Sequence, residues 1–139
     1  MKRVLSVAIA ALSVPAVALG GALDGYAGLW STADKDALVR VEDCGDGTLC
    51  GVIQWVKPDP DGVLDANNPD PTLRTRPLVG LRILYGFQPR DGSWQRGRIY
   101  DPGSGRTVAG RVYRTADGSL KVTGCLGPFC QDQIWTRAR

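Results

Sequence analysis

Residues 93–125 read SWQRGRIYDPGSGRTVAGRVYRTADGSLKVTGC, and this stretch decides the fold class. β-Favouring runs alternate in it with short turn-forming segments, in the order 93–100, 101–105, 106–115, 116–118 and 119–125. Glycine, proline and aspartate in such short connections favour hairpin turns, because they tolerate the backbone conformations that tight turns require. The stretch therefore predicts three antiparallel strands in succession.

The same pattern extends over the rest of the chain, where glycine recurs too often for a long helix. Eight strands are predicted in total, over residues 28–32, 37–43, 50–56, 79–87, 93–100, 106–115, 119–125 and 130–137. Six of the seven connections are short enough for hairpins, which predicts an all-β fold, an eight-stranded up-and-down antiparallel barrel. Closure removes both exposed sheet edges, although evenly spaced strands are also compatible with a sandwich.

The seventh connection, residues 57–78, carries five prolines and is rich in aspartate and asparagine. Proline cannot donate to a sheet ladder, so this segment is predicted to be a long loop and not a strand. Within it, Asp70 and Pro71 suit the N-cap and the first position of a helix of one or two turns, which Pro77 would end. A loop of this length in a compact domain is usually functional or flexible.

The same loop offers oxygen atoms that could bind calcium, on Asp59, Asp61, Asp65, Asn67 and Asp70. Their spacing does not match the calcium loop of an EF-hand, which ends in a distal glutamate. We therefore interpret these side chains as caps of turns, through hydrogen bonds to the backbone. No metal site and no cofactor are predicted.

Residues 1–22 are predicted to be a secretory signal peptide. Lys2 and Arg3 precede an uncharged run that begins at Val4, and small residues follow it. The run has about sixteen residues, short of the ~20 that span a bilayer. The mature chain is expected to start between Leu19 and Leu23, to form one domain over residues 23–139, and to lie in the periplasm or outside the cell without a membrane span.

The charge and residue content exclude several classes of protein. The chain has 17 Lys+Arg, 14 Asp+Glu and no His. Removal of Lys2 and Arg3 with the signal peptide leaves 15 basic residues, so the charge gives no argument for a nucleic-acid partner. The absence of histidine excludes Ser-His-Asp and Cys-His catalysis, and no convergent pair of acids is recognisable, so we do not expect an enzyme.

The four cysteines are predicted to form two disulfides, because an exported protein meets an oxidising compartment. Each of two close pairs flanks a turn, and we therefore expect the local links Cys44–Cys50 and Cys125–Cys130. A four-cysteine zinc site is the alternative, although the C-x5-C and C-x4-C spacings are wider than is usual for structural zinc.

The two ends of the mature chain are predicted to meet, since the first and last strands of a closed barrel are neighbours. Gly28 and Trp30 lie in the first strand and Arg137 lies in the last. An arginine can stack on the face of a tryptophan, in a cation–π contact of ~0.5–2 kcal/mol. This arrangement resembles the lipocalin/calycin superfamily, where a G-x-W near the start meets an arginine near the end. These residues would then close the barrel and would not contact a ligand.

Several further stretches resemble the DUF2147 family of exported bacterial proteins. They are LCGVI (49–53), DANNPDP (65–71), RPL (76–78), GLRIL (80–84), GRIYDP (97–102), Gly105 and WTR (135–137). The resemblance covers essentially the whole mature chain and implies an exported, lipocalin-like β-barrel. The biochemical function of the family is not established, so the resemblance implies no activity.

Candidate ligand-binding residues are of two kinds. Arginine suits a ligand with a carboxylate or phosphate group, and aromatic side chains could line a ligand cavity. The candidates are Trp55, Arg74, Arg76, Trp94, Arg98 and Tyr100. The alternatives are a solvated exterior face for the arginines and ordinary packing for the aromatic residues.

Two functions from different classes remain. The first is an exported calycin-like barrel that binds a small apolar or amphipathic ligand, which an eight-stranded barrel can hold. The second is an envelope interaction or structural protein, with a protein partner, whose barrel is filled by its own side chains. A continuous apolar cavity would favour the first, and a packed interior would favour the second.

Overall fold

The computed structural model describes residues 6, 8–11, 21–59 and 63–139. The elements are β1 Gly28–Ser31, β2 Ala37–Asp43, β3 Leu49–Val56, the short 3-10 helix η1 Pro71–Leu73, β4 Arg82–Tyr85, β5 Gln88–Arg90, β6 Ser93–Asp101, β7 Arg106–Arg114, β8 Leu120–Leu126 and β9 Phe129–Arg137. The predicted signal peptide, residues 1–22, lies mostly outside the described residues. Among those residues, no helix has the length and hydropathy that crossing a bilayer requires.

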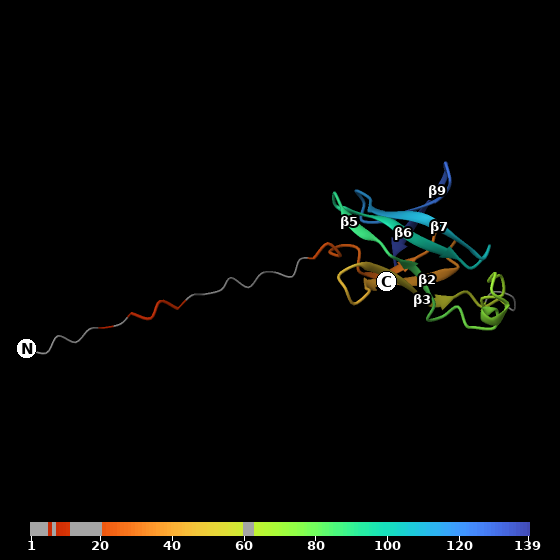
Figure 1. Cartoon of the computed structure of the whole chain (residues 1–139), viewed down its shortest axis with the longest axis horizontal. Helices are drawn as coiled ribbons and strands as arrows, with labels where there is room; N and C mark the ends of the chain where they lie inside the picture. Colours follow the sequence, from red (N-terminus) through yellow and green to blue (C-terminus); the bar gives the residue numbers. More distant parts are fainter. Residues whose placement is uncertain (1–5, 7, 12–20, 60–62) are drawn as a thin grey trace, which may run out of the picture.

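The strands form one antiparallel sheet in the order β4-β3-β2-β1-β9-β8-β7-β6-β5. A further pairing of β4 with β6 closes eight of them into a barrel, to which β5 is attached as an extra strand (Figure 1). The prediction of an eight-stranded antiparallel barrel is therefore confirmed, and the sandwich alternative is wrong. The first and last strands, β1 and β9, are neighbours as expected.

The extra strand was not predicted from the sequence. A single strand was expected over 79–87, but β4 ends at Tyr85 and is followed by Gly86 with a φ of +72°. This left-handed conformation is not extended, so it interrupts the strand. Glycine adopts it at little cost, because it has no Cβ atom. The chain then pairs again as β5, whose central Pro89 is tolerated because β5 lies at a sheet edge.

One end of the barrel, called the closed end here, lies beside the N-terminal segment 21–27 (Figure 1). The guanidinium of Arg137 lies 4.3 Å from the centroid of the Trp30 ring, and the two residues are directly paired between β1 and β9. Nη1 and Nη2 of Arg137 donate hydrogen bonds to the carbonyls of Ala27 and Gly25, at 3.3 and 3.2 Å. The stacked arginine therefore also fixes the segment that covers this end.

Gly28 makes room for that stack. A Cβ atom at this position would lie 2.5 Å from Nη1 of Arg137, and φ is +138°. Both facts disfavour any other residue. The structure thus brings together the three residues that the sequence assigned to barrel closure.

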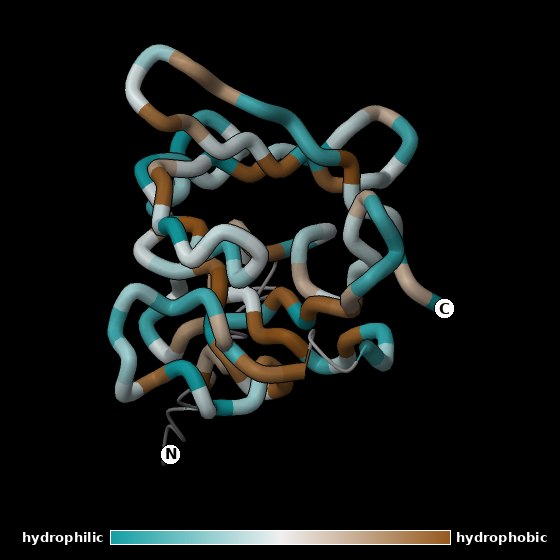
Figure 2. The backbone as a smooth tube through the Cα atoms, turned by 90° about the vertical axis from the view of Figure 1, so that its right-hand side faces the viewer, coloured by the Kyte–Doolittle hydropathy of each residue, from teal (hydrophilic) through white to brown (hydrophobic). Residues whose placement is uncertain are grey.

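Large side chains fill the barrel interior from the closed end to the level of Leu84 and Ile99. Trp30, Val39, Leu84, Phe87, Val112 and Leu120 are completely buried, and Trp94 is nearly so. In Figure 2 the strongly hydrophobic positions are concentrated in the strands, while most connecting turns are hydrophilic. This part of the barrel is a protein core rather than an empty cavity.

Both local cysteine pairs form disulfides, as expected. Cys44 and Cys50 enclose the turn between β2 and β3, and their Cα atoms are 5.1 Å apart. Cys125 and Cys130 lie opposite each other on β8 and β9, with a Cα separation of 4.0 Å. Neither pair is free to bind zinc, so the four-cysteine alternative is wrong.

Residues 63–78 of the long loop lie at the opposite end of the barrel, called the loop end here (Figure 1). Asp70 caps η1 by accepting a hydrogen bond from the amide of Thr72 at 2.9 Å, and Pro71 is its first residue. The predicted cap is confirmed, and the short helix is a single 3-10 turn that ends at Leu73, before Pro77. Leu78 is buried and connects the end of the loop to the core.

Candidate functional site

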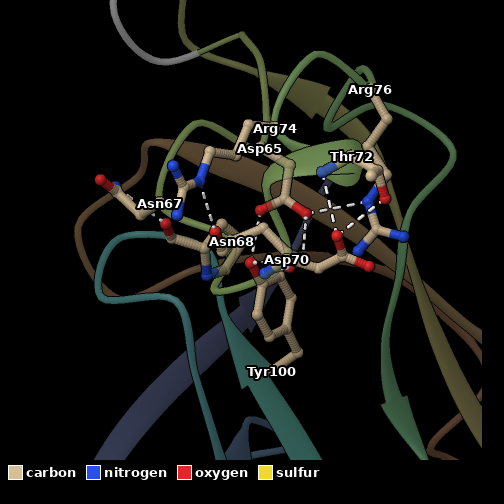
Figure 3. Close-up of polar contacts among 9 residues, drawn as sticks. Asp65, Asn67, Asn68, Asp70, Thr72, Arg74, Arg76 and Tyr100 are labelled. Atoms are coloured by element: carbon tan, nitrogen blue, oxygen red, sulfur yellow. Dashed lines mark hydrogen bonds and ion pairs between the residues drawn. The ribbon is translucent and has the colours of Figure 1, made fainter.

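A buried carboxylate lies where the loop meets the barrel. Asp65 is completely buried and accepts hydrogen bonds from three side chains (Figure 3). Tyr100, on β6, donates its hydroxyl proton to Oδ1, while Asn68 Nδ2 and Arg76 Nε each lie 2.8 Å from Oδ2. A buried carboxylate is tolerated only when it is paired and hydrogen-bonded in this way.

The loop is folded back on itself around Asp65 and Asn68. The amide of Asp65 donates to the carbonyl of Arg76 at 3.0 Å, which brings the beginning and the end of this loop segment together. Arg74 Nε donates to the carbonyl of Asn68 at 2.8 Å, and Oδ1 of Asn68 accepts from the amide of Asp70 at 2.8 Å. These bonds occupy backbone groups that a loop would otherwise expose or leave unpaired.

A second contact fastens the loop to the turn between β6 and β7. Asn67 Nδ2 donates to the carbonyls of Pro102 and Gly103, each at 3.1 Å. The loop also touches Gly105, whose φ is +71° and where a Cβ atom would lie 1.9 Å from the carbonyl oxygen of Asn67. The approach of the two backbones therefore requires glycine at position 105.

The network shifts the ionisation of its two titrating members in opposite directions. Burial favours a raised pKa for Asp65, but the hydrogen bonds from Tyr100, Asn68 and Arg76 outweigh it and hold the pKa below its ordinary value. Burial, followed by the hydrogen bond to the charged carboxylate, raises the pKa of Tyr100 to about 12. Asp65 is therefore a carboxylate and Tyr100 a neutral donor at neutral pH.

An open cleft of about 410 Å³ lies on this network. It is lined by Asn68, Pro69, Arg76, Leu81, Arg82, Tyr85, Tyr100, Gly105 and Thr107. Two guanidinium groups, two phenol groups and an apolar edge thus face one concavity. We call it the loop cleft.

A second cleft, of about 510 Å³, lies over the strands β7, β8 and β9. It is also open to solvent and lies away from the loop. We call it the sheet cleft.

The structure brings together three of the six candidate ligand-binding residues. Arg74, Arg76 and Tyr100 all belong to the network around Asp65 and Asn68, and two of them line the loop cleft. Their positions on the loop and on β6 explain this, since the loop folds back over the strand.

The other three candidates lie elsewhere. Trp94 is buried toward the closed end, where its indole donates to the carbonyl of Ala22 and meets the edge of Tyr26, with ring centroids 6.4 Å apart. Trp55 lies beside Leu38 on β2, with 41% of its surface exposed. Arg98 is exposed on β6, between Tyr85 and Ala109 on the neighbouring strands.

The central residues of the network, Asp65 and Asn68, were not among those candidates. The sequence predicts Asp65 to be a turn cap, with a calcium ligand as the alternative, and the structure shows a buried ion pair. Asp61 lies outside the described residues. Across 21–59 and 63–139, no three acidic or cysteine residues gather as a metal site would require.

The comparisons with known proteins agree with this architecture. Residues 28–137 match the DUF2147 family, described as an uncharacterized protein conserved in bacteria. The chain belongs to the DUF2147 family. A search of curated proteins found no match. The family resemblance proposed from the sequence is thus confirmed over the whole barrel.

A solved structure shows the same fold. The Helicobacter pylori protein HP1028, described as a member of the lipocalin family, superposes with a TM-score of 0.67 over 81% of this chain and 82% of its own. The sequence identity is 22%, so the likeness extends to the fold alone. The DUF2147 barrel is therefore lipocalin-like, and its chemistry has to be argued from its own residues.

Proposed function

We propose that this DUF2147 protein is an extracytoplasmic binding protein, and that the loop cleft takes a small amphipathic ligand with a carboxylate or phosphate group. The observation that carries the proposal is the pair of arginines, Arg76 and Arg82, in a concavity that also has apolar atoms of Leu81 and Pro69. A charged head would meet the guanidinium groups, and an apolar tail would lie along Leu81 and Pro69.

The charge of the cleft supports an anionic head group. The buried carboxylate of Asp65 is neutralised by Arg76, and Arg82 adds a further positive charge. The ion pair uses Nε of Arg76, while the side chain remains 36% exposed. The rest of its planar fork is thus available for the paired hydrogen bonds that carboxylates and phosphates accept from arginine.

The filled core supports a site at the loop cleft rather than deep inside the barrel. The interior toward the closed end is occupied by side chains with no exposed surface, such as Trp30, Phe87 and Leu120. This observation also favours the second function considered from the sequence, an envelope interaction protein with a filled barrel. Ligand binding at the loop cleft distinguishes the two.

The proposed location rests on the cysteines and on the predicted signal peptide. Two disulfides suit an oxidising compartment such as the periplasm. N-terminal sequencing of the purified protein should give a start between Leu19 and Leu23, and an intact Met1 in the membrane fraction would contradict export. We further propose that the protein acts by binding and not by catalysis, because Asp65 is fully engaged with three partners.

Native mass spectrometry of protein purified from its own periplasm tests for a ligand directly, since a bound anion would add mass. Calorimetric titration then compares dodecanoate with dodecanol, which has the same tail without the charge. We expect dodecanoate to bind and dodecanol to bind at least tenfold more weakly, because only the acid can pair with the guanidinium groups.

Arg82→Gln should weaken dodecanoate binding about tenfold, the loss expected for a charge-assisted contact. Arg90→Gln is the matched control, because Arg90 is exposed on β5, away from the loop cleft. Equal binding of the alcohol and the acid, or an equal loss in both arginine variants, would contradict the proposed site.

A further inference from the structure

The hairpin of β8 and β9 ends in an exposed apolar tip. Leu126 and Phe129 are directly opposite each other at its end, and 56% and 79% of their surfaces are exposed. Figure 2 shows this hairpin extending from the body of the molecule, with hydrophobic positions at its tip. Exposed side chains of this size, placed side by side, are typical of a contact with another surface.

The tip is cross-linked and accessible. The disulfide between Cys125 and Cys130 joins the two strands at the residues next to Leu126 and Phe129. Strand β1 pairs with β9 only at Thr136 and Arg137. Among the described strands, the part of β9 nearer the tip therefore pairs with β8 alone. The hairpin can therefore reach a flat surface before the rest of the barrel does.

Positive charge lies behind the tip, in the sheet cleft. The cleft is lined by three cations, Arg111, Arg114 and Lys121, and by one carboxylate, Asp132. That carboxylate is paired with Lys121 at 3.5 Å and accepts a hydrogen bond from Thr123 at 2.7 Å. Arg111 therefore remains as a positive charge near the hairpin, whereas the guanidinium of Arg114 lies against Gly25 at the closed end.

The order of apolar tip and cation along the strands matches the order of acyl chain and phosphate in a lipid layer. Arg111 lies level with Thr123, three residues from Leu126. At ~3.3 Å per residue, this places the cation about 10 Å behind the tip. Apolar residues of peripheral proteins enter about 5–10 Å into the boundary of head groups and acyl chains.

We propose that this hairpin docks the protein on an anionic lipid surface, with Leu126 and Phe129 at the acyl boundary and Arg111 at the level of the phosphates. The proposal is independent of ligand binding at the loop cleft. A second copy of the chain fits less well, because the open edge of β9 carries the polar residues Gln131, Asp132 and Gln133, and two sheet clefts would bring like charges together.

Co-sedimentation of the purified protein with vesicles tests the proposal. We expect binding to vesicles of phosphatidylethanolamine and phosphatidylglycerol, weak binding to phosphatidylcholine alone, and loss of binding at high salt. Inorganic phosphate, added while the total ionic strength is held constant, should not compete with the vesicles, because a free anion lacks the apolar contact.

Phe129→Ser should reduce vesicle binding about tenfold, since the apolar side chain provides much of the insertion energy. Ile134→Ser is the matched control: Ile134 is 46% exposed on the same strand but lies five residues from Phe129. It should leave binding unchanged, and Arg111→Gln should weaken binding to the anionic vesicles only. Both serine variants change exposed side chains, and near-ultraviolet circular dichroism checks that they fold.

Three outcomes would overturn the proposal. The first is absence of binding to the anionic vesicles. The second is an equal effect of Phe129→Ser and Ile134→Ser. The third is a dimer in sedimentation velocity that Phe129→Ser dissociates without any vesicle binding by the original protein, which would assign the tip to a second copy.

Discussion

The two ends of the barrel satisfy their buried polar groups in different ways. At the closed end the partners are backbone carbonyls: Trp30 donates to Tyr26 at 2.8 Å, Tyr26 donates to Gly92 at 2.7 Å, and Arg137 donates to two further carbonyls. At the loop end the partner is a side-chain carboxylate, Asp65.

This difference separates a part built for stability from a part that responds to its surroundings. Backbone carbonyls do not titrate, so the closed end holds the same contacts over a wide pH range. A buried carboxylate does titrate, and every group around it depends on its charge. The loop end is also where the loop cleft lies, so a change in the network would reach the proposed ligand site.

Removal of the carboxylate should have the largest effect. Asp65→Ala is expected to lower the free energy of unfolding by about 3 kcal/mol, because Tyr100 and Asn68 lose their partner while they remain buried. Urea denaturation measures the change. Glu42→Ala, at an exposed site on β2, is the control and should have little effect. A loss below 1 kcal/mol for Asp65→Ala would mean that water replaces the carboxylate at low cost.

Acid should weaken the loop end before the closed end. The pKa of Asp65 is lower in the folded state than in the unfolded chain, where it is about 3.9. Its contribution is therefore complete above that value and is lost as the pH falls through the lower folded-state pKa. Asp65→Asn should flatten this part of the stability profile, measured by thermal unfolding between neutral and strongly acidic pH. An unchanged slope in the variant would assign the acid sensitivity to other carboxylates.

The close approach of loop and turn should make Gly105 much less replaceable than a glycine at the opposite end. Gly105→Ala is expected to cost about 2 kcal/mol, from the positive φ and from the contact with the backbone of Asn67. Gly92→Ala, where φ is +77° and no atom lies within 4 Å of the added Cβ, should cost about 1 kcal/mol. Equal losses in chemical denaturation would show that the loop moves aside freely.

The stack at the closed end should contribute less than Asp65 does. Arg137→Ala is expected to lower stability by about 1–2 kcal/mol, through the lost contact with Trp30 and the two released carbonyls. Arg137→Lys should recover only part of this, because an ammonium lacks the planar fork. Arg139→Ala, at the exposed C-terminus, controls for the loss of charge. Full recovery of stability in Arg137→Lys would show that the positive charge alone, and not the planar guanidinium, provides the stabilisation.

The closed end was predictable from the sequence, and the loop end was not. Successive hairpins leave the first and last strands as the two edges, so closure makes these strands neighbours, and the G-x-W and terminal arginine pattern places Trp30 beside Arg137. Asp65 gave no such signal, because its burial depends on a loop that folds back over Tyr100, 35 residues away. The extra strand β5 was missed for a local reason, the break at Gly86. A local clue to its pairing was Arg76, a cation that follows Asp65 in the same loop.

The smallest expected effect compares one short motif at the two ends. Asp46 and Asp70 each accept hydrogen bonds from the amide and the hydroxyl of a threonine two residues later, Thr48 and Thr72. In both cases hydrogen bonds from that threonine lower the pKa of the aspartate. The two motifs differ in what surrounds them, since the turn with Asp46 is enclosed by the disulfide of Cys44 with Cys50 and η1 is not enclosed by any covalent link.

Asp70→Ala should therefore lower the thermal midpoint slightly, by less than Arg137→Ala, and Asp46→Ala should lower it even less. The disulfide holds the turn after the cap is removed, whereas the loop relies on its hydrogen bonds alone. After reduction of the disulfides the two substitutions should have similar effects, because both turns then depend on the same local bonds. A larger effect of Asp46→Ala in the oxidised protein would show that the covalent link does not protect the closed end.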